Sequence, residues 1–276
     1  GSIVDEMYLI NYDFASAIDV LTMSFLFGFQ IYFDFSAYSH IALGSALLFG
    51  IKIPENFNFP YIATSLKDFW KRWHISLSAW IRDYLYLPLS GVKVSNSSGQ
   101  VGIGKVLSDT TKKKSNIPLL VTWAIMGLWH GSNWTFLFWG LFHAFFIFIE
   151  RLFKPLRDKF SWINIKLLNW GITLIISMLS WIPFRVNSIE ETFLLYSKLF
   201  DFNNFFNLSF RENSYIITLL ILLIFICNYY FKQLVVPRLK NNHTIFFIYT
   251  CFKYLLIVFL TIIFLKPINQ FIYFQF

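Results

Sequence analysis

Long stretches of this chain carry almost no charge, and this limits what it can fold into. Phe14–Phe33 contains only Asp19, and neither Leu167–Phe184 nor Tyr215–Phe231 contains a charged residue. About 20 apolar residues in a helix cross the roughly 30 Å hydrocarbon core of a bilayer, and a helix satisfies its own backbone polar groups there. With 57% hydrophobic and 14% charged residues, the chain is predicted to be an all-α polytopic membrane protein in a lipid bilayer, with residues 1–276 as one membrane domain.

Further spans are expected on both sides of a shorter, divided segment. Phe35–Ile51 follows the first run after Asp34, and Ile245–Leu265 is the last. Between them, Ile117–His130 has only 14 residues, about 21 Å as a helix, which is too short to cross comfortably, and Trp134–Ile149 follows it before the next basic cluster. They are predicted to form a re-entrant hairpin with His130 near its tip.

Basic residues gather beside the apolar runs, which explains the net charge of +8. The polar loop Val92–Asn116 and the clusters in residues 151–166 and 232–243 are therefore expected on the cytoplasmic side, and the more acidic loop Val186–Ser214 on the outer side. This distribution favours anionic lipid headgroups as the partner of the positive charge, and no nucleic-acid function is inferred. Cys227 and Cys251 lie in apolar runs and are expected to be buried thiols.

Ser65–Leu87 is predicted to be a basic amphipathic helix lying in the interface. At 100° per residue one face is aromatic and aliphatic, while Lys67, Lys71 and Arg82 fall opposite. His74 lies on the flank of the apolar stripe, where it can face either the headgroups or the protein. Spacing alone favours a solvated interfacial histidine.

The sequence around His130 is the strongest candidate for chemistry. His130 and His143 lie in an uncharged run of Trp, Phe and Leu, and an ionisable group at membrane depth is a functional hypothesis by default. Gly131-Ser-Asn133 indicates a break between two helices, and the glycines of this stretch permit close backbone or ligand approach. The competing interpretation is a packed histidine, which is weaker for His130 and stronger for His143, because His143 lies inside the second helix.

The chain contains no motif for a serine hydrolase, a nucleotide phosphatase or a zinc protease, and no metal site is predicted. A neutral imidazole can take a proton from an alcohol and return it to a leaving group, as acyl transfer from a thioester to a hydroxyl requires. A different class of function is also open: a proton-coupled transporter or flippase in which His130 and Asp34 relay protons.

Two long motifs carry a family resemblance. Residues 69–89 read FWKRWHISLSAWIRDYLYLPL and residues 127–143 read GLWHGSNWTFLFWGLFH. In this order they resemble the membrane-bound O-acyltransferase (MBOAT) family, in its bacterial branch of alginate and peptidoglycan O-acetyltransferases, which is related to the D-alanyl transferase of teichoic acid. Residues 30–39, QIYFDFSAYS, and 271–276, FIYFQF, are similar to the same branch.

The resemblance implies two site histidines. His130, in Trp-His-Gly, corresponds to the catalytic histidine, and His74, in Arg-Trp-His, to the second signature histidine. Trp129, Asn133, Trp134 and His143, together with Asp34, are the candidates for lining a substrate channel.

The resemblance also implies a ring of transmembrane, re-entrant and interfacial helices in the bacterial cytoplasmic (inner) membrane. No cofactor is expected to stay bound; acetyl-CoA is implied as the acyl donor. The acceptor is expected to be a cell-envelope polysaccharide or an exported SGNH-type acetyltransferase partner. Family members are longer, and this chain is expected to correspond to their carboxyl-terminal portion, without the amino-terminal helices. Pro183 in WIPFR departs from the family pattern, which leaves the local helix geometry open.

Overall fold

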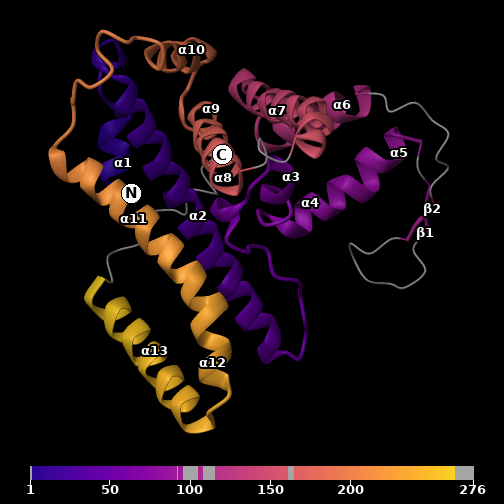
Figure 1. The fold of residues 1–276 in the computed structure, drawn as a ribbon, viewed down its shortest axis with the longest axis vertical. Helices are drawn as coiled ribbons and strands as arrows, with labels where there is room; N and C mark the ends of the chain where they lie inside the picture. The colour runs from indigo at the N-terminus through magenta and orange to yellow at the C-terminus, as the bar shows by residue number, and fades with distance from the viewer. Residues whose placement is uncertain (1, 92, 96–104, 108–115, 161–164, 265–276) are drawn as a thin grey trace.

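The computed structural model describes residues 2–91, 93–95, 105–107, 116–160 and 165–264. Five of its helical segments are long and apolar enough to cross a membrane. Figure 1 shows them as an elongated helical assembly, with a short hairpin of β1 (Lys93–Ser95) and β2 (Lys105–Leu107) projecting beyond it. The prediction of an all-α polytopic membrane protein is confirmed, apart from this small antiparallel ribbon.

The first long helix is α2 (Ala17–Leu48), which follows the short α1 (Ser2–Met7) and the 3-10 turn η1 (Tyr12–Phe14). Ser16 and Asp19 form a reciprocal capping box at its start. The fully buried Asp19 carboxylate also accepts from Tyr215 Oη and the Ser209 backbone N–H, so it ties this helix end to the segment around residues 209–215. The prediction of two spans divided at Asp34 is wrong: α2 is continuous, because one aspartate does not interrupt the helix backbone.

The span predicted at Leu167–Phe184 begins as expected and then divides near Pro183. Helix α8 (Lys166–Leu179) ends at Ser180, and α9 (Ile182–Arg185) starts with the proline in its first turn, where a missing N–H costs nothing. Gly28 of α2 lies where a Cβ would approach Met178 Sδ to 2.6 Å, so α2 and α8 are in close contact. Trp181, at the junction, is 1% exposed.

Helices α6 (Ile117–His130) and α7 (Trp134–Lys159) form the predicted hairpin around a break at Gly131–Asn133. Their backbones approach closely at two glycines: a Cβ on Gly127 would lie 2.3 Å from the Phe136 carbonyl oxygen, and one on Gly140 would lie 2.1 Å from that of Trp123. The expected close approach at these glycines is confirmed.

The predicted amphipathic helix is not continuous. It consists of α3 (Leu66–Phe69), a turn at residues 70–74, α4 (Ile75–Ile81), a π-helical turn η3 (Arg82–Tyr86) and α5 (Leu87–Leu89). Before it, the 3-10 turn η2 (Pro60–Ile62) follows the proline-containing loop. Phe69 and Trp73 are buried, whereas Trp80 and Tyr84 are more than half exposed, so the first part lies mainly in the core and the later part enters it at Ile81. Glu150 of α7 accepts from the Leu66 N–H (2.8 Å) and caps α3.

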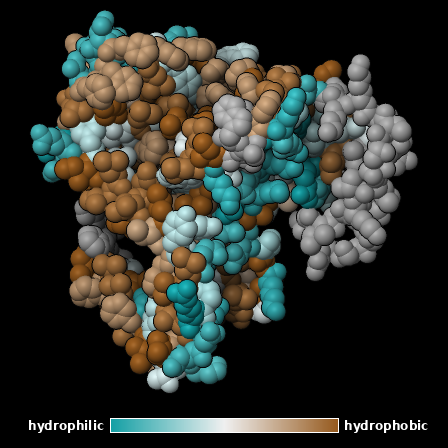
Figure 2. Space-filling view, viewed as in Figure 1, coloured by the Kyte–Doolittle hydropathy of each residue, from teal (hydrophilic) through white to brown (hydrophobic). Residues whose placement is uncertain are grey.

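The remaining elements lie around α2. Helix α10 (Ile189–Lys198) occupies the loop predicted on the outer side, and α11 (Glu212–Tyr230) runs beside α2 in Figure 1. The chain continues through η5 (Phe231–Val235) and α12 (Val236–Lys240) to α13 (His243–Phe264). Cys227 and Cys251 are exposed on the described chain rather than buried as expected, because they point away from the core on these outer helices. Figure 2 shows apolar residues over much of this face and hydrophilic ones around α12 at its lower end.

Most of the polar loop Val92–Asn116, part of the cluster in residues 151–166, and the terminal residues 271–276 lie outside the described residues.

Candidate functional site

One pocket brings the two signature histidines together, although 56 positions separate them in the sequence (130 − 74 = 56). Its other lining residues are large and mostly aromatic, and come from α2, the α3–α4 turn, α6, α7 and the α8–α9 junction: Ile31, Trp70, Trp73, Met126, Trp139, Trp181 and Phe184. Five separate parts of the chain therefore build the walls, and the two imidazoles are the titratable groups among them.

His130 lies at the carboxyl end of α6, where the helix stops. The next residue, Gly131, is extended, and a Cβ there would lie 2.3 Å from the Phe136 ring, so the break needs glycine for space. The half-buried imidazole packs edge-on against Trp129, Trp139 and Phe184, with ring centroids 4.8–5.2 Å apart. These neighbours fix the ring in place while leaving part of it accessible.

His74 occupies a backbone conformation that is unusual for its residue type. Its φ of 43° is left-handed, as is that of Phe59, and these are the non-glycine examples among the described residues. His74 is the N-cap residue immediately before α4. The Asn56 backbone oxygen accepts a hydrogen bond from the N–H of Ile75, the first residue of that helix. The left-handed residue turns the chain between α3 and α4, and this directs the imidazole into the pocket instead of toward headgroups. The interfacial interpretation favoured by spacing alone is therefore wrong.

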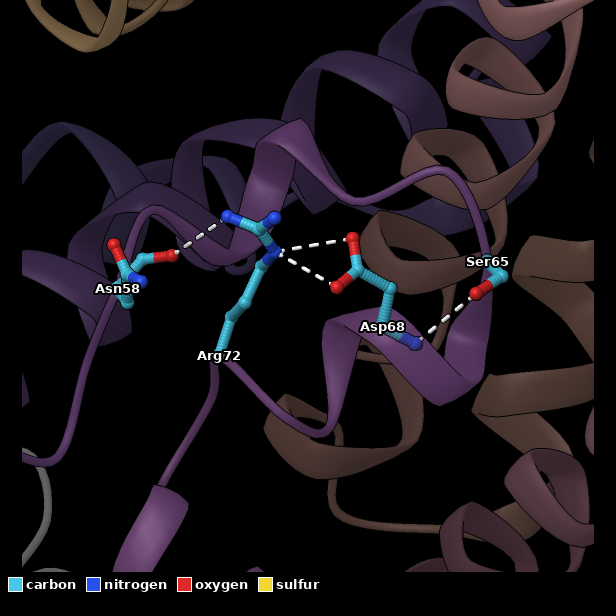
Figure 3. Close-up of polar contacts among 4 residues, drawn as sticks. All are labelled: Asn58, Ser65, Asp68 and Arg72. Atoms are coloured by element: carbon cyan, nitrogen blue, oxygen red, sulfur yellow. Dashed lines mark hydrogen bonds and ion pairs between the residues drawn. The ribbon is translucent and has the colours of Figure 1, made fainter. Parts of the chain in front are cut away.

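The turn that carries His74 is braced by the extended segment before it. Arg72 Nε donates to both carboxylate oxygens of Asp68 (3.0 Å each), and its Nη1 donates to the Asn58 carbonyl oxygen (3.3 Å; Figure 3). The Asn58 N–H donates to the Arg72 carbonyl oxygen (2.9 Å), and Ser65 caps α3 at the Asp68 N–H. Because the salt bridge is partly exposed, it contributes at most about 1 kcal/mol, and its main effect is to orient the turn.

The hydrogen bonds of Asn56 define the tautomer of His74. Asn56 Oδ1 accepts from the Ser76 N–H (3.1 Å) and the Ser76 hydroxyl (2.9 Å), which identifies that atom as the oxygen. It also lies 3.2 Å from His74 Nδ1, so Nδ1 carries the proton and Nε2 is the basic nitrogen. Burial, reinforced by the proximity of His130, lowers the pKa of His74 from its ordinary 6.5 to about 3. His74, which lies outside the membrane-spanning helices, is thus neutral at physiological pH.

We expect Asn56→Leu to lower both stability and any activity that depends on His74. The change removes the acceptor for three donors and costs about 1–3 kcal/mol. Thermal unfolding of the purified protein in detergent measures the loss. Asn58→Ala is the matched control, because the exposed Asn58 contacts Arg72 through its backbone. Equal unfolding temperatures for Asn56→Leu and wild type would contradict the assigned role of Asn56.

His143 lies behind the pocket wall and does not line the pocket. The ring is fully buried, stacks on Trp123 (centroids 5.2 Å apart) and accepts at Nδ1 from Trp70 Nε1–H (3.4 Å). Trp139, one turn earlier on α7, separates it from the pocket; its centroid is 5.0 Å from those of both His130 and His143. The arrangement agrees with the packed-histidine interpretation of His143.

The other channel candidates lie outside the pocket. Trp129 and Trp134 are 58% and 72% exposed, because they lie on helix faces that turn away from it. Asn133 Oδ1 caps α7 at the Thr135 N–H, and its amide donates to the Asn187 carbonyl oxygen (2.8 Å), so it fixes the hairpin tip to the chain before α10. Asp34 is half-buried on α2 but does not line the pocket, so the structure does not pair it with His130 there.

Several site residues had no clear signal in the sequence. Trp139 and Trp181 look like ordinary core aromatics, and Asn56 looks like a loop residue. A spacing signal existed for Trp139, which lies four residues before His143 on one helix face. No group of three or more His, Cys, Asp or Glu side chains that could hold a metal ion lies within the described ranges.

Comparison with known proteins identifies the family. Residues 14–189, more than half of the chain, match the family model described as MBOAT, membrane-bound O-acyltransferase family. The chain belongs to the membrane-bound O-acyltransferase family. The matched region contains both histidines and every residue that lines the pocket.

Curated relatives support the assignment of this MBOAT chain. It is 39% identical over 175 residues to a probable alginate O-acetylase AlgI of Azotobacter vinelandii, covering 63% of this chain and 31% of the relative. It is 38% identical over 176 residues to a peptidoglycan O-acetyltransferase of Helicobacter pylori (64% and 30%). A teichoic acid D-alanyltransferase of Bacillus subtilis is 32% identical over 173 residues (56% and 40%). The matches thus span about a third of the length of these relatives.

Proposed function

We propose that this protein is an integral membrane O-acyltransferase that moves an acyl group from a thioester to a hydroxyl, and that this acyl group is acetyl. The observation that carries the proposal is the pocket in which His74 and His130 meet between aromatic walls. Family membership supports the reaction class, and the relatives named O-acetylase and O-acetyltransferase support acetyl as the group.

In this proposal His130 is the general base. An imidazole nitrogen takes the proton of the acceptor hydroxyl as its oxygen attacks the thioester carbonyl carbon, and returns the proton to the departing thiolate. His74 stays neutral, with Asn56 holding its Nδ1 proton, and from its place in the pocket lining it orients the acceptor hydroxyl. The apolar walls keep out water that would otherwise hydrolyse the thioester.

In this proposal the protein lies in the inner membrane of a bacterium. The donor is acetyl-CoA, which reaches the pocket from the cytoplasmic side. The acceptor is a hydroxyl of a cell-envelope polysaccharide, or of an exported SGNH-type acetyltransferase that completes the transfer outside. The charge pattern predicts that the basic segments lie on the cytoplasmic side. Because CoA is polyanionic, this supports donor entry from that side. We further propose residues 1–276 as part of one membrane domain.

The proposal is tested with inverted membrane vesicles that contain the protein expressed from its complete gene. Acetyl-CoA labelled in the acetyl group is added outside, on the former cytoplasmic face. We expect label to accumulate as alkali-labile ester on polymer or protein inside the vesicles, and vesicles without the protein are the control. Proton-driven solute uptake with no ester formation would refute acyl transfer and favour the transporter function instead.

A further inference from the structure

Trp139 is a buried hydrogen-bond donor without an acceptor in the part of the chain that the structure describes. Its side chain is 1% exposed, and its indole Nε1 has no hydrogen-bond partner among the described residues. An indole nitrogen can only donate, and leaving such a donor unpaired in an apolar interior costs about 1–3 kcal/mol. The unpaired indole N–H therefore destabilises the folded protein, and a ligand atom that accepts a hydrogen bond from it would remove this free-energy cost.

Other indoles of the core are paired differently. Trp70 Nε1–H donates to His143 Nδ1, and Trp170 Nε1–H donates to the Tyr61 carbonyl oxygen (2.9 Å). Trp181 Nε1 also has no partner that meets hydrogen-bond geometry among the described residues, but it lies beside the Tyr61 hydroxyl. It faces α2, because a Cβ added to Gly28 of that helix would lie 3.3 Å from it. Among the unpaired indoles, Trp139 is thus the one whose ring also contacts His130.

The position of Trp139 relates its N–H to the chemistry of the pocket. The ring lines the pocket and meets the His130 ring edge-on at 5.0 Å between centroids, with an interplanar angle of 86°. A carbonyl carbon attacked with His130 as the base would have to lie in this pocket, and therefore beside both side chains. The ring packs against His143 and Trp181, with centroids 5.0 and 6.3 Å away, so the donor does not need to reorganise during the reaction.

We infer that the Trp139 indole N–H donates a hydrogen bond to the acyl carbonyl oxygen and stabilises the negative charge that develops there. This rests on the acyl transfer proposed above. The acceptor hydroxyl loses its proton to His130 and its oxygen bonds to the carbonyl carbon, while the carbonyl π electrons move to the oxygen that Trp139 binds. The C=O bond then reforms, the C–S bond breaks, and the thiolate takes the proton back from His130; an ester and a thiol result.

The test removes the N–H while keeping the ring. In the protein expressed from its complete gene, Trp139 is replaced by β-(3-benzothienyl)alanine, which has sulfur in place of the N–H, and separately by phenylalanine. With acetyl-CoA as donor and release of free CoA thiol as the readout, we expect kcat to fall by about 100-fold in both variants, since loss of one oxyanion donor costs about 10²–10³ in rate. KM for acetyl-CoA is expected to change by less than about threefold, because the bond is made mainly in the transition state.

Trp123→Phe is the matched control: Trp123 also packs against His143 and Trp139 but does not line the pocket. We expect its kcat to stay within about threefold of wild type, as for a change that leaves transition-state contacts intact. A benzothienylalanine variant with wild-type kcat would overturn the inference, as would equal losses of kcat in this variant and in Trp123→Phe. If the wild type releases no CoA thiol and forms no ester, the proposed function itself fails.

Discussion

Replacing His130 by alanine is expected to lower the ester-linked acyl content of the cell envelope at least about 100-fold, because general-base catalysis contributes about 10²–10⁴ in rate. The measurement is the release of acyl groups from the envelope by mild alkali, in cells that express the variant from the complete gene. His130→Gln is expected to behave alike, since an amide retains polarity but cannot carry the proton.

The control for the His130 variants is His40→Ala. His40 is an exposed histidine on α2, and its Nδ1 lies 2.7 Å from the Ser36 carbonyl oxygen of its own helix, away from the pocket. Its removal is expected to leave ester content unchanged. Normal ester content in His130→Ala, at wild-type protein levels in the membrane, would remove His130 from the chemistry.

Replacing Gly140 by alanine is expected to separate the hairpin that carries His130. The new Cβ would lie 2.1 Å from the Trp123 carbonyl oxygen and 3.3 Å from Gly127 Cα. Both neighbours are backbone atoms, so no change of rotamer relieves the contact and the helices must move apart. We expect a loss of at least about 3 kcal/mol in unfolding free energy, the upper end of the usual range for overpacking. The readouts are the amount of folded protein in the membrane and its thermal unfolding in detergent.

Gly171→Ala is the matched control for this prediction. Gly171 also lies inside an apolar helix, α8, but a Cβ added there would have no atom within 4 Å. Alanine there is expected to be neutral or to stabilise by up to about 1 kcal/mol, since it has the higher helix propensity. A Gly140→Ala protein as stable as Gly171→Ala would show that α6 and α7 do not pack as described.

The α6–α7 hairpin was predictable because its signals are local. The short apolar run Ile117–His130, the Gly-Ser-Asn break and the glycines of the contact all lie within one stretch of sequence. Asp34 misled the prediction, because a charge was taken as a helix boundary although an aspartate is compatible with a helix interior. The continuity of α2 depends on its packing against neighbouring segments. The spacing of residues within one segment gives no information on that packing.

The pocket itself depends on contacts between distant segments, and this explains what residue spacing missed. Helical periodicity assigned His74 to an unbroken amphipathic helix, whereas the turn at residues 70–74 is held by hydrogen bonds from Asn56 and Asn58. Nothing in the periodicity of residues 65–87 encodes those bonds. The family resemblance singled out His74 because it draws on the motif as a whole, but it carries no information on the unpaired indole of Trp139.

The length of α2 limits how the pocket can be reached. Its 32 residues extend for about 48 Å, well beyond the roughly 30 Å hydrocarbon thickness, so the helix must slant or protrude from the bilayer. Ile31, which contributes to the pocket, is close to the midpoint of that helix, so the pocket lies about 20 Å or more along the helix axis from either end. Under the proposed function, a slender extension, such as the pantetheine arm of a coenzyme or the end of one flexible chain, would deliver the reacting atom to a site this far from both helix ends.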